Sequence, residues 1–251
     1  MASSIKSLIA GGPQAMVQAA GRLIGLEIRR TGPSARDDLR LAYFLKTRGI
    51  ELLFDVGANR GQFATHMFDA GFAGEIVSFE AMPHAHAILS KAAASSGRRW
   101  TVAPAGALSD SEGEVEFTVN SSDATSSLLE ASADSLESIP GIRPQGKVKV
   151  PTRRLDDVAA GYGVGTRRSF IKIDVQGGEG LVLAGASETL KQVDGLQIEL
   201  SLTELYAGQP LFQDVLAQLL PLGFDLYDIS PAYRDPANYR LKQVDAVLLR
   251  R

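Results

Sequence analysis

The segment Leu52–Phe63, which reads LLFDVGANRGQF, constrains the fold of this 251-residue chain more than any other. Its apolar run ends in an acid and two glycines and then passes into residues that suit a helix. Asp55 is too polar for the middle of a buried strand, so it marks the carboxyl end, where open α/β sheets bind their ligands. Gly57 and Gly61 permit a tight turn and the close approach of a ligand. A helix that begins at Gln62 would direct its free N–H groups toward that ligand.

The glycine pattern differs from that of dinucleotide-binding folds. It reads D-x-G-x-N-x-G, with Asp55 and Asn59 where a G-x-G-x-x-G turn keeps its backbone clear for a pyrophosphate. The acid favours a ligand with a positive group. The next buried strand ends in Glu80, 25 positions later, close to the interval of about 20 at which such folds place a ribose-binding carboxylate. S-adenosylmethionine (SAM) has cationic amino and sulfonium groups and a ribose diol, and therefore fits two acids at two strand ends.

Buried strands alternate with helical segments along the chain, which predicts a parallel, doubly wound sheet. We expect seven strands, the last inserted antiparallel, with helices on both faces: the seven-stranded, mostly parallel sheet of a Rossmann-like class I methyltransferase. The expected strands are 52–56, 76–79, 100–103, 170–175, 195–200, 224–229 and 244–249, and the expected helices are 37–48, 62–70, 84–95, 181–190 and 210–220.

Two regions interrupt this rhythm. We predict an N-terminal helical extension, 1–36, before a SAM-dependent methyltransferase domain, 37–251, that carries a lid or hairpin insertion around 111–168. In the insertion, 113–119 and 148–152 read as exposed strands, and the serine-rich stretch 120–138 reads as a lid over the acceptor or as a solvated surface loop.

The apolar runs of the extension are short and broken by Gly11, Gly12 and Pro13, which fits neither a membrane span nor a signal peptide. The extension would instead pack on the domain, form a homo-oligomer contact, or touch a membrane surface. The basic residues available for a membrane contact are Lys6, Arg22, Arg29 and Arg30.

Charge and cysteine content exclude several functions. The formal net charge is −3, which provides no electrostatic attraction to nucleic acid. There are no cysteines, which excludes disulfides, thiolate metal sites and a cysteine nucleophile. The absence of cysteine is typical of a reducing compartment, so we expect a cytoplasmic protein.

Five blocks in order, taken together, resemble the FkbM family of SAM-dependent O-methyltransferases. They are Phe54–Gly61, Phe79–Pro83, Ala107–Asp110 with Gly113, Arg154–Asp157 and Ile171–Glu179. The resemblance implies methyl transfer to a hydroxyl of a small molecule, sugar, glycolipid or polyketide. One departure is Gln176, where the family commonly has glutamate.

The resemblance also implies cofactor roles. Asp55, Gly57, Asn59 and Gly61 would line the methionine end of SAM, Glu80 would bind its ribose, and Met82 would cover a face of the adenine. Phe63 and Ala81 complete this predicted set. Ser109 and Asp110 would contact the adenine rim, although Asp110 also suits a turn or N-cap position.

Candidate catalytic residues lie at the ends of two neighbouring strands. Lys172 and Asp174 share one strand face because strand periodicity is two, and Glu199 ends the next strand. A carboxylate there could act as a general base, or Asp174 and Glu199 could hold Mg²⁺. The alternatives are a structural ion pair of Lys172 with Asp174 and a hydrogen-bonded structural role for Glu199.

Rival functions predict other features. A non-catalytic SAM-fold protein, serving as a partner or a membrane-associated scaffold, would have lost its strand-end acids, whereas Asp55, Glu80, Asp174 and Glu199 are all present. A nucleic-acid methyltransferase would usually carry an N-P-P-Y-like motif after the fourth strand, where this chain reads DVQG. We therefore expect a small-molecule, glycan or lipid acceptor and no nucleic-acid partner.

Overall fold

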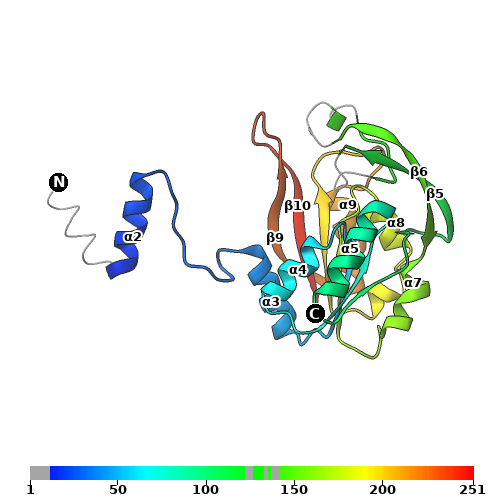
Figure 1. The fold of residues 1–251 in the computed structure, drawn as a ribbon, viewed down its shortest axis with the longest axis horizontal. Helices are drawn as coiled ribbons and strands as arrows, with labels where there is room; N and C mark the ends of the chain where they lie inside the picture. The colour runs from blue at the N-terminus through cyan, green and yellow to red at the C-terminus, as the bar shows by residue number, and fades with distance from the viewer. Residues whose placement is uncertain (1–11, 122–126, 133–134, 137–138, 140–141) are drawn as a thin grey trace. The chain divides into compact units, whose positions relative to one another are not determined.

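The chain divides into two compact units, Met1–Tyr43 and Phe44–Arg251. The computed structural model of the protein (Figure 1) describes residues 12–121, 127–132, 135–136, 139 and 142–251. The first unit contains helix α2 (Gly12–Leu23) and the start of helix α3 (Asp37–Thr47). The predicted boundary after residue 36 stays a prediction, as do membrane and homo-oligomer contacts of the extension, and Lys6 lies outside the described residues. In the described part of the chain, no helix is long and apolar enough to cross a membrane.

The second unit is built on a seven-stranded sheet in the order β3-β2-β1-β7-β8-β10-β9. Its strands are β1 (Leu52–Val56), β2 (Glu75–Phe79), β3 (Trp100–Val102), β7 (Ser169–Ile173), β8 (Gly195–Ser201), β9 (Phe224–Arg234) and β10 (Leu241–Arg250). Strands β3, β2, β1, β7 and β8 pair in parallel, whereas β10 lies antiparallel between β8 and β9. The predicted class I methyltransferase arrangement is therefore confirmed, including the inserted last strand.

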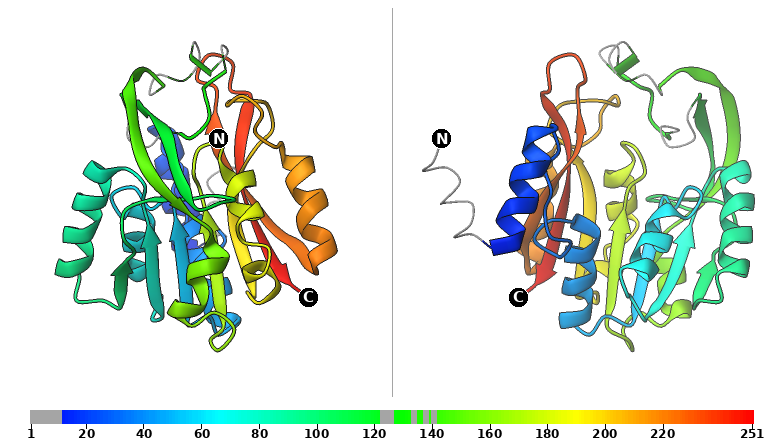
Figure 2. Two further views of the ribbon diagram at one scale, coloured as in Figure 1. Left: turned by 90° about the vertical axis from the view of Figure 1, so that its right-hand side faces the viewer. Right: turned by 60° about the vertical axis from the view of Figure 1, so that its left-hand side comes forward.

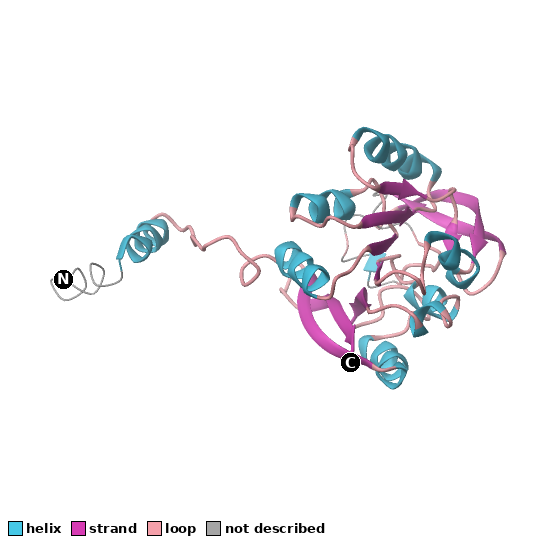
Figure 3. Ribbon diagram, turned by 90° about the horizontal axis from the view of Figure 1, so that it is seen from below, coloured by secondary structure: helices cyan, strands magenta, loops and turns pink. Residues whose placement is uncertain are grey.

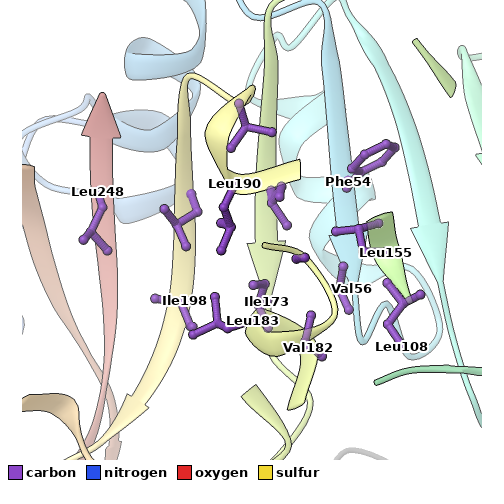
Figure 4. Packing of buried hydrophobic residues seen from close by; sticks show 14 of the residues in the cluster. Phe54, Val56, Leu108, Leu155, Ile173, Val182, Leu183, Leu190, Ile198 and Leu248 are labelled. Atoms are coloured by element: carbon purple, nitrogen blue, oxygen red, sulfur yellow. The ribbon is translucent and has the colours of Figure 1, made fainter. Parts of the chain in front are cut away.

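Helices lie on both faces of this sheet (Figure 3). The alternation of side chains along β1 assigns residues to the two layers. Phe54 and Val56 belong to the main core with Leu155 of α7 (Leu155–Val158) and Val182 of α8 (Glu179–Ala184), as Figure 4 shows. On the opposite face lie α4 (Gln62–Asp69) and α5 (Pro83–Ser95), where Pro83 supplies the fixed φ that suits a first helical position. Helix α9 (Phe212–Leu219) adds buried residues to the main core.

The helix expected over 181–190 is interrupted, which corrects that prediction. Helix α8 ends at Ala184, and a 3₁₀ turn, η3 (Thr189–Lys191), follows. Gly185 lies at the break, and a Cβ there would lie 1.9 Å from the carbonyl oxygen of Ser109, so this close contact requires glycine. Asp156 then accepts hydrogen bonds from the backbone N–H groups of Glu188 and Thr189, so it holds the new turn against α7.

The insertion and the strand just before it form a second sheet of three strands, in the order β4-β6-β5. It consists of β4 (Ala107–Leu108), β5 (Gly113–Asn120) and β6 (Pro144–Arg153), and β6 is longer than the expected 148–152 because it pairs with β5 along nearly its whole length. Figure 2 shows the long strands of this three-stranded sheet, called the ribbon below, in green beside the large sheet. Phe117 and Val150 of the ribbon pack with Met82 and Ala85 at the start of α5. The ribbon is thereby joined to the end of β2.

The stretch 120–138, which the sequence leaves open between a lid and a surface loop, is partly described. Residues 122–126, 133–134 and 137–138 lie outside the described residues. Ser127 pairs with Thr118 of β5, and Ala131 forms an antiparallel bridge with Tyr206, which follows β8. The described part is thus bonded both to the ribbon and to the loop after β8.

Gly57 gives a test of the turn after β1. Its φ is +78°, and a Cβ there would lie 1.8 Å from the carbonyl oxygen of Asp174. Gly71 has a similar φ of +95° but open space around it. We expect Gly71→Ala to cost about 1 kcal/mol and Gly57→Ala more than about 3 kcal/mol in the free energy of unfolding, measured with urea. Equal losses in the two variants would contradict this account of the turn.

Candidate active site

A cavity of about 660 Å³, including its open mouth, lies at the carboxyl ends of β1, β2 and β7. The large sheet and its loops contribute one part of the wall, and the insertion contributes the other. The lining residues are Val56, Gly57, Asn59, Phe79, Glu80, Ala81, Met82, Gly106, Ala107, Leu108, Phe117, Leu128, Asp174, Val175 and Gln176.

The turn after β1 forms one side of this cavity. The N–H groups of Gly57 and Ala58 both donate to the carbonyl oxygen of Phe79, which ties the turn to the end of β2. Asn59 has a φ of +48°, a conformation that asparagine tolerates better than most residues. Its side-chain oxygen is buried and has no hydrogen-bond partner among the described residues. This oxygen can therefore accept a hydrogen bond from a ligand.

Glu80 is buried and held in place by the backbone. One carboxylate oxygen accepts the N–H of Met82 at 2.7 Å, and the other accepts the N–H of Asn59 at 2.8 Å. Burial raises the pKa of Glu80, while the two N–H groups favour its ionised form. Each oxygen has a further lone pair, so the fixed carboxylate could accept both hydroxyls of a ribose.

Behind the cavity wall, Lys172 lies between two acids. Its ammonium nitrogen is 3.4 Å from Asp55 and 3.3 Å from Asp174, and it donates to the carbonyl oxygen of Gly57. Burial alone would lower the pKa of Lys172, but the charges of Asp174 and Asp55 outweigh it and raise that pKa. Lys172 is therefore a protonated ion-pair partner, and the ring of Phe63 lies 5.4 Å from its nitrogen. The ion pair expected as the structural alternative for Lys172 is present, with Asp55 as a second partner.

Asp55 does not line the cavity. It is fully buried, and its second carboxylate oxygen accepts a hydrogen bond from Ser78, which in turn accepts one from the indole of Trp100. Gly61 is also turned away from the cavity, because a Cβ there would lie 2.6 Å from the Trp100 ring. These residues support the turn from behind.

Gln176 joins the two predicted catalytic acids. Its amide nitrogen donates to Asp174 at 2.9 Å and to Glu199 at 3.0 Å, and its amide oxygen accepts from the hydroxyl of Tyr206 at 3.2 Å. Glu199 also accepts from the amide of Gln243 at 2.6 Å. Burial, with the negative charges of neighbouring acids, raises the pKa of Glu199 well above its usual value.

Within the described part of the chain, no group of three His, Cys, Asp or Glu side chains is arranged to hold a metal ion. Asp174 and Glu199, the predicted ligands, share the amide nitrogen of Gln176 instead. The Mg²⁺ prediction has no support in this geometry.

The structure separates the predicted site residues into two groups. Six of them line the cavity: Gly57, Asn59, Glu80, Ala81, Met82 and Asp174. The others, Asp55, Gly61, Phe63, Ser109, Asp110, Lys172 and Glu199, do not. Ser109 packs against Gly185, and its side chain donates to Asp110. The predicted contact of these two residues with the adenine rim stays a prediction.

The insertion contributes two apolar lining residues, Phe117 and Leu128, that were not predicted from the sequence. Phe117 is a buried apolar residue of β5, and the alternation of this strand marks it as inward-facing, although not toward a cofactor. Leu128 lies in the serine-rich stretch, where no periodic signal distinguishes it.

The strand order, with a cavity that runs from the glycine turn of β1 to the acid after β2, defines a class I methyltransferase. The model of the FkbM methyltransferase domain matches residues 55–226. The chain is 30% identical to the 2-O-methyltransferase NoeI of Sinorhizobium fredii (strain NBRC 101917 / NGR234) over 176 residues, which cover 68% of this chain and 71% of the relative. The chain belongs to the FkbM methyltransferase family and is a SAM-dependent methyltransferase.

Solved structures show more distant similarity. One is the magnesium protoporphyrin IX methyltransferase ChlM of Synechocystis PCC 6803 with bound SAM, at a TM-score of 0.45 and 11% identity, covering 87% of this chain and 80% of that one. Another is the fibrillarin/Nop5p complex, at a TM-score of 0.47 and 14% identity, covering 85% and 83%.

The ionisation of Glu179 should make the stability of the fold depend on pH. It is buried beside the site, and its oxygen Oε1 accepts the N–H groups of Val175 and Gly177. Burial raises its pKa from 4.5 to about 7. Between these values the unfolded chain ionises the carboxyl while the folded chain keeps it protonated, so stability falls as pH rises.

Glu179→Gln keeps the accepting oxygen and removes the ionisation. We expect the variant to gain about 2 kcal/mol of unfolding free energy relative to the wild type between pH 5 and pH 7.5, measured by urea denaturation at both values. A difference between the two proteins that does not change with pH would contradict the raised pKa.

Proposed function

We propose that this chain is an O-methyltransferase that methylates a hydroxyl of a small molecule, sugar, glycolipid or polyketide. The observation that carries the proposal is that Asp174 lines the same cavity as Glu80 and Asn59. A proton acceptor therefore faces the space in which the methyl donor would lie. The similarity to NoeI, a 2-O-methyltransferase, supports a hydroxyl as the acceptor group.

The cavity residues fit SAM. Glu80, fixed by two backbone N–H groups, would accept hydrogen bonds from the ribose hydroxyls. Met82 and Phe117, which pack in one apolar cluster, would hold the adenine. The free side-chain oxygen of Asn59 would accept from the cationic amino group at the methionine end, near Gly57. Asp55 would contribute indirectly, through its ion pair with Lys172 behind the turn.

Proton removal would fall to Asp174. When bound, SAM supplies a methyl group already activated by its sulfonium, so the protein must chiefly place the acceptor and accept its proton. Asp174 would accept the hydroxyl proton as the acceptor oxygen bonds to the methyl carbon and the bond from that carbon to the sulfonium sulfur breaks, which leaves S-adenosylhomocysteine. Lys172 and Gln176 contact opposite oxygens of its carboxylate and hold it in place. Glu199 lies behind Gln176 and does not line the cavity, so it supports this arrangement without touching the acceptor.

Two substitutions separate donor binding from chemistry. Glu80→Gln should weaken SAM binding about 10- to 100-fold, measured by isothermal titration, because it removes charge-assisted hydrogen bonds. Asp174→Asn should slow methyl transfer at least about 100-fold while SAM affinity stays within about fivefold. Transfer is measured with radiolabelled SAM on cell extract fractionated into sugars, lipids and other small molecules.

Asp69→Asn serves as the control, because Asp69 is exposed at the end of α4. It should leave both quantities unchanged. A wild-type rate of methyl transfer in Asp174→Asn would contradict the proposed role of Asp174 as the base. A labelled product whose methyl group lies on nitrogen or carbon would contradict O-methylation.

A further inference from the structure

The loop between β7 and α8 holds Gln176 in a conformation that few residues adopt. Its φ of +56° lies in the left-handed region, which is unfavourable for a residue that is not glycine. Its carbonyl oxygen accepts the hydroxyl of Ser127, from the insertion, at 2.5 Å. The next residue, Gly177, packs so closely that a Cβ there would lie 2.7 Å from the Tyr206 ring. The loop is therefore held by contacts on two sides, and these contacts fix the backbone position of Gln176.

Every polar atom of the Gln176 side chain has a partner. The two amide hydrogens go to Asp174 and Glu199, and the amide oxygen accepts from Tyr206. Only one orientation of the amide satisfies these partners, because carboxylates accept and the phenol donates. Asp174 lines the cavity and its side chain is 33% exposed, and the Gln176 amide joins it to Glu199, which does not line the cavity.

In this chain the charges around residue 176 suit a neutral donor, whereas the family commonly has glutamate there. The acids that face the pair Asp174 and Glu199 are Asp55 on β1, Glu179 on α8 and Asp245 on β10, together with the phenol of Tyr206, and Lys172 on β7 is their cationic neighbour. An amide adds two N–H groups and no charge. A carboxylate at residue 176 would add another negative charge and would have no N–H to give.

We propose that Gln176 is a positioning residue for methyl transfer, which fixes the Asp174 carboxyl group toward the acceptor by tying it to Glu199 through one amide nitrogen. This inference rests on the proposed base role of Asp174. Gln176 does not bind the methyl donor in this account, although it lines the cavity. Its loss should therefore affect the rate and its pH dependence more than SAM affinity.

Gln176→Glu and Gln176→Met provide the direct test. Both keep the length of the side chain, and both lose the two N–H donors. We expect each to lower the initial rate at saturating SAM about 10- to 100-fold, with SAM affinity within about threefold. In Gln176→Glu the acidic limb of the rate–pH profile should also move up by about one pH unit, because another negative charge opposes ionisation of the acid pair.

Gln243→Glu is the matched control for the added charge. Gln243 donates to the same oxygen of Glu199, and no hydrogen bond links it to Asp174. We expect a smaller shift of the acidic limb in Gln243→Glu than in Gln176→Glu. An equal shift would mean that charge alone, and not the contact with Asp174, moves the profile, and it would overturn the proposal.

Tyr206→Phe keeps the proposal testable if the Gln176 variants do not fold. It removes only the phenol oxygen, so the amide of Gln176 loses the donor to its oxygen. We expect a smaller loss of rate, about 3- to 10-fold, without a change in SAM affinity.

A wild-type rate and pH profile in Gln176→Met and Gln176→Glu, or in Tyr206→Phe where those two do not fold, would overturn the positioning role. The same assay on Asp174→Asn distinguishes a failure of the base role proposed for Asp174 from a failure of the positioning role proposed for Gln176. A wild-type rate in that variant removes the proposed base itself. If Asp174→Asn transfers methyl groups slowly while the Gln176 variants keep the wild-type rate, only the inference about Gln176 is contradicted.

Discussion

The ion pairs of Lys172 organise the carboxyl edge of the sheet. Several acids face one another at this edge, among them Asp55, Asp174 and Glu199, and Lys172 is 3.4 Å and 3.3 Å from two of them, Asp55 and Asp174. Breaking a buried pair costs about 3–5 kcal/mol because it leaves a charge without compensation. Lys172 also donates to Gly57, so one ammonium group ties the ends of β1 and β7 to the glycine turn. The placement of Asp174 in the cavity wall follows from this arrangement.

The cavity depends on two parts of the chain that are far apart in sequence. The ends of the parallel strands supply its polar groups, because backbone N–H groups fix Glu80 and the Lys172 ion pair fixes Asp174. The insertion supplies an apolar wall through Phe117 and Leu128. The same insertion holds the Gln176 loop through Ser127. The insertion thus contacts both the space proposed for the donor and the loop that joins the acids.

Much of the fold could be predicted from the sequence because its strands are apolar runs that end at glycines or acids. The run Leu52–Val56 has the predicted bounds, and the antiparallel last strand lies where it was expected. The roles of individual residues were harder to predict. Gly57 lines the cavity, as expected for a residue beside a ligand, but the atom closest to its missing Cβ is the carbonyl oxygen of Asp174. Asp55 was expected beside the ligand, and it is instead buried behind the turn.

The bonds of Gln176 could not be predicted, since they arise from a left-handed backbone and three segments distant in sequence. The contribution of Leu128 to the cavity likewise depends on tertiary pairing and not on local pattern.

A crystal structure with bound S-adenosylhomocysteine, the product form of the donor, would test the central claim most directly. We predict ribose hydroxyls within hydrogen-bond distance of Glu80, adenine against Met82 and Phe117, and the sulfur directed to the side of the cavity lined by Asp174. Product bound without contact to Glu80, or with its sulfur directed away from Asp174, would contradict the account.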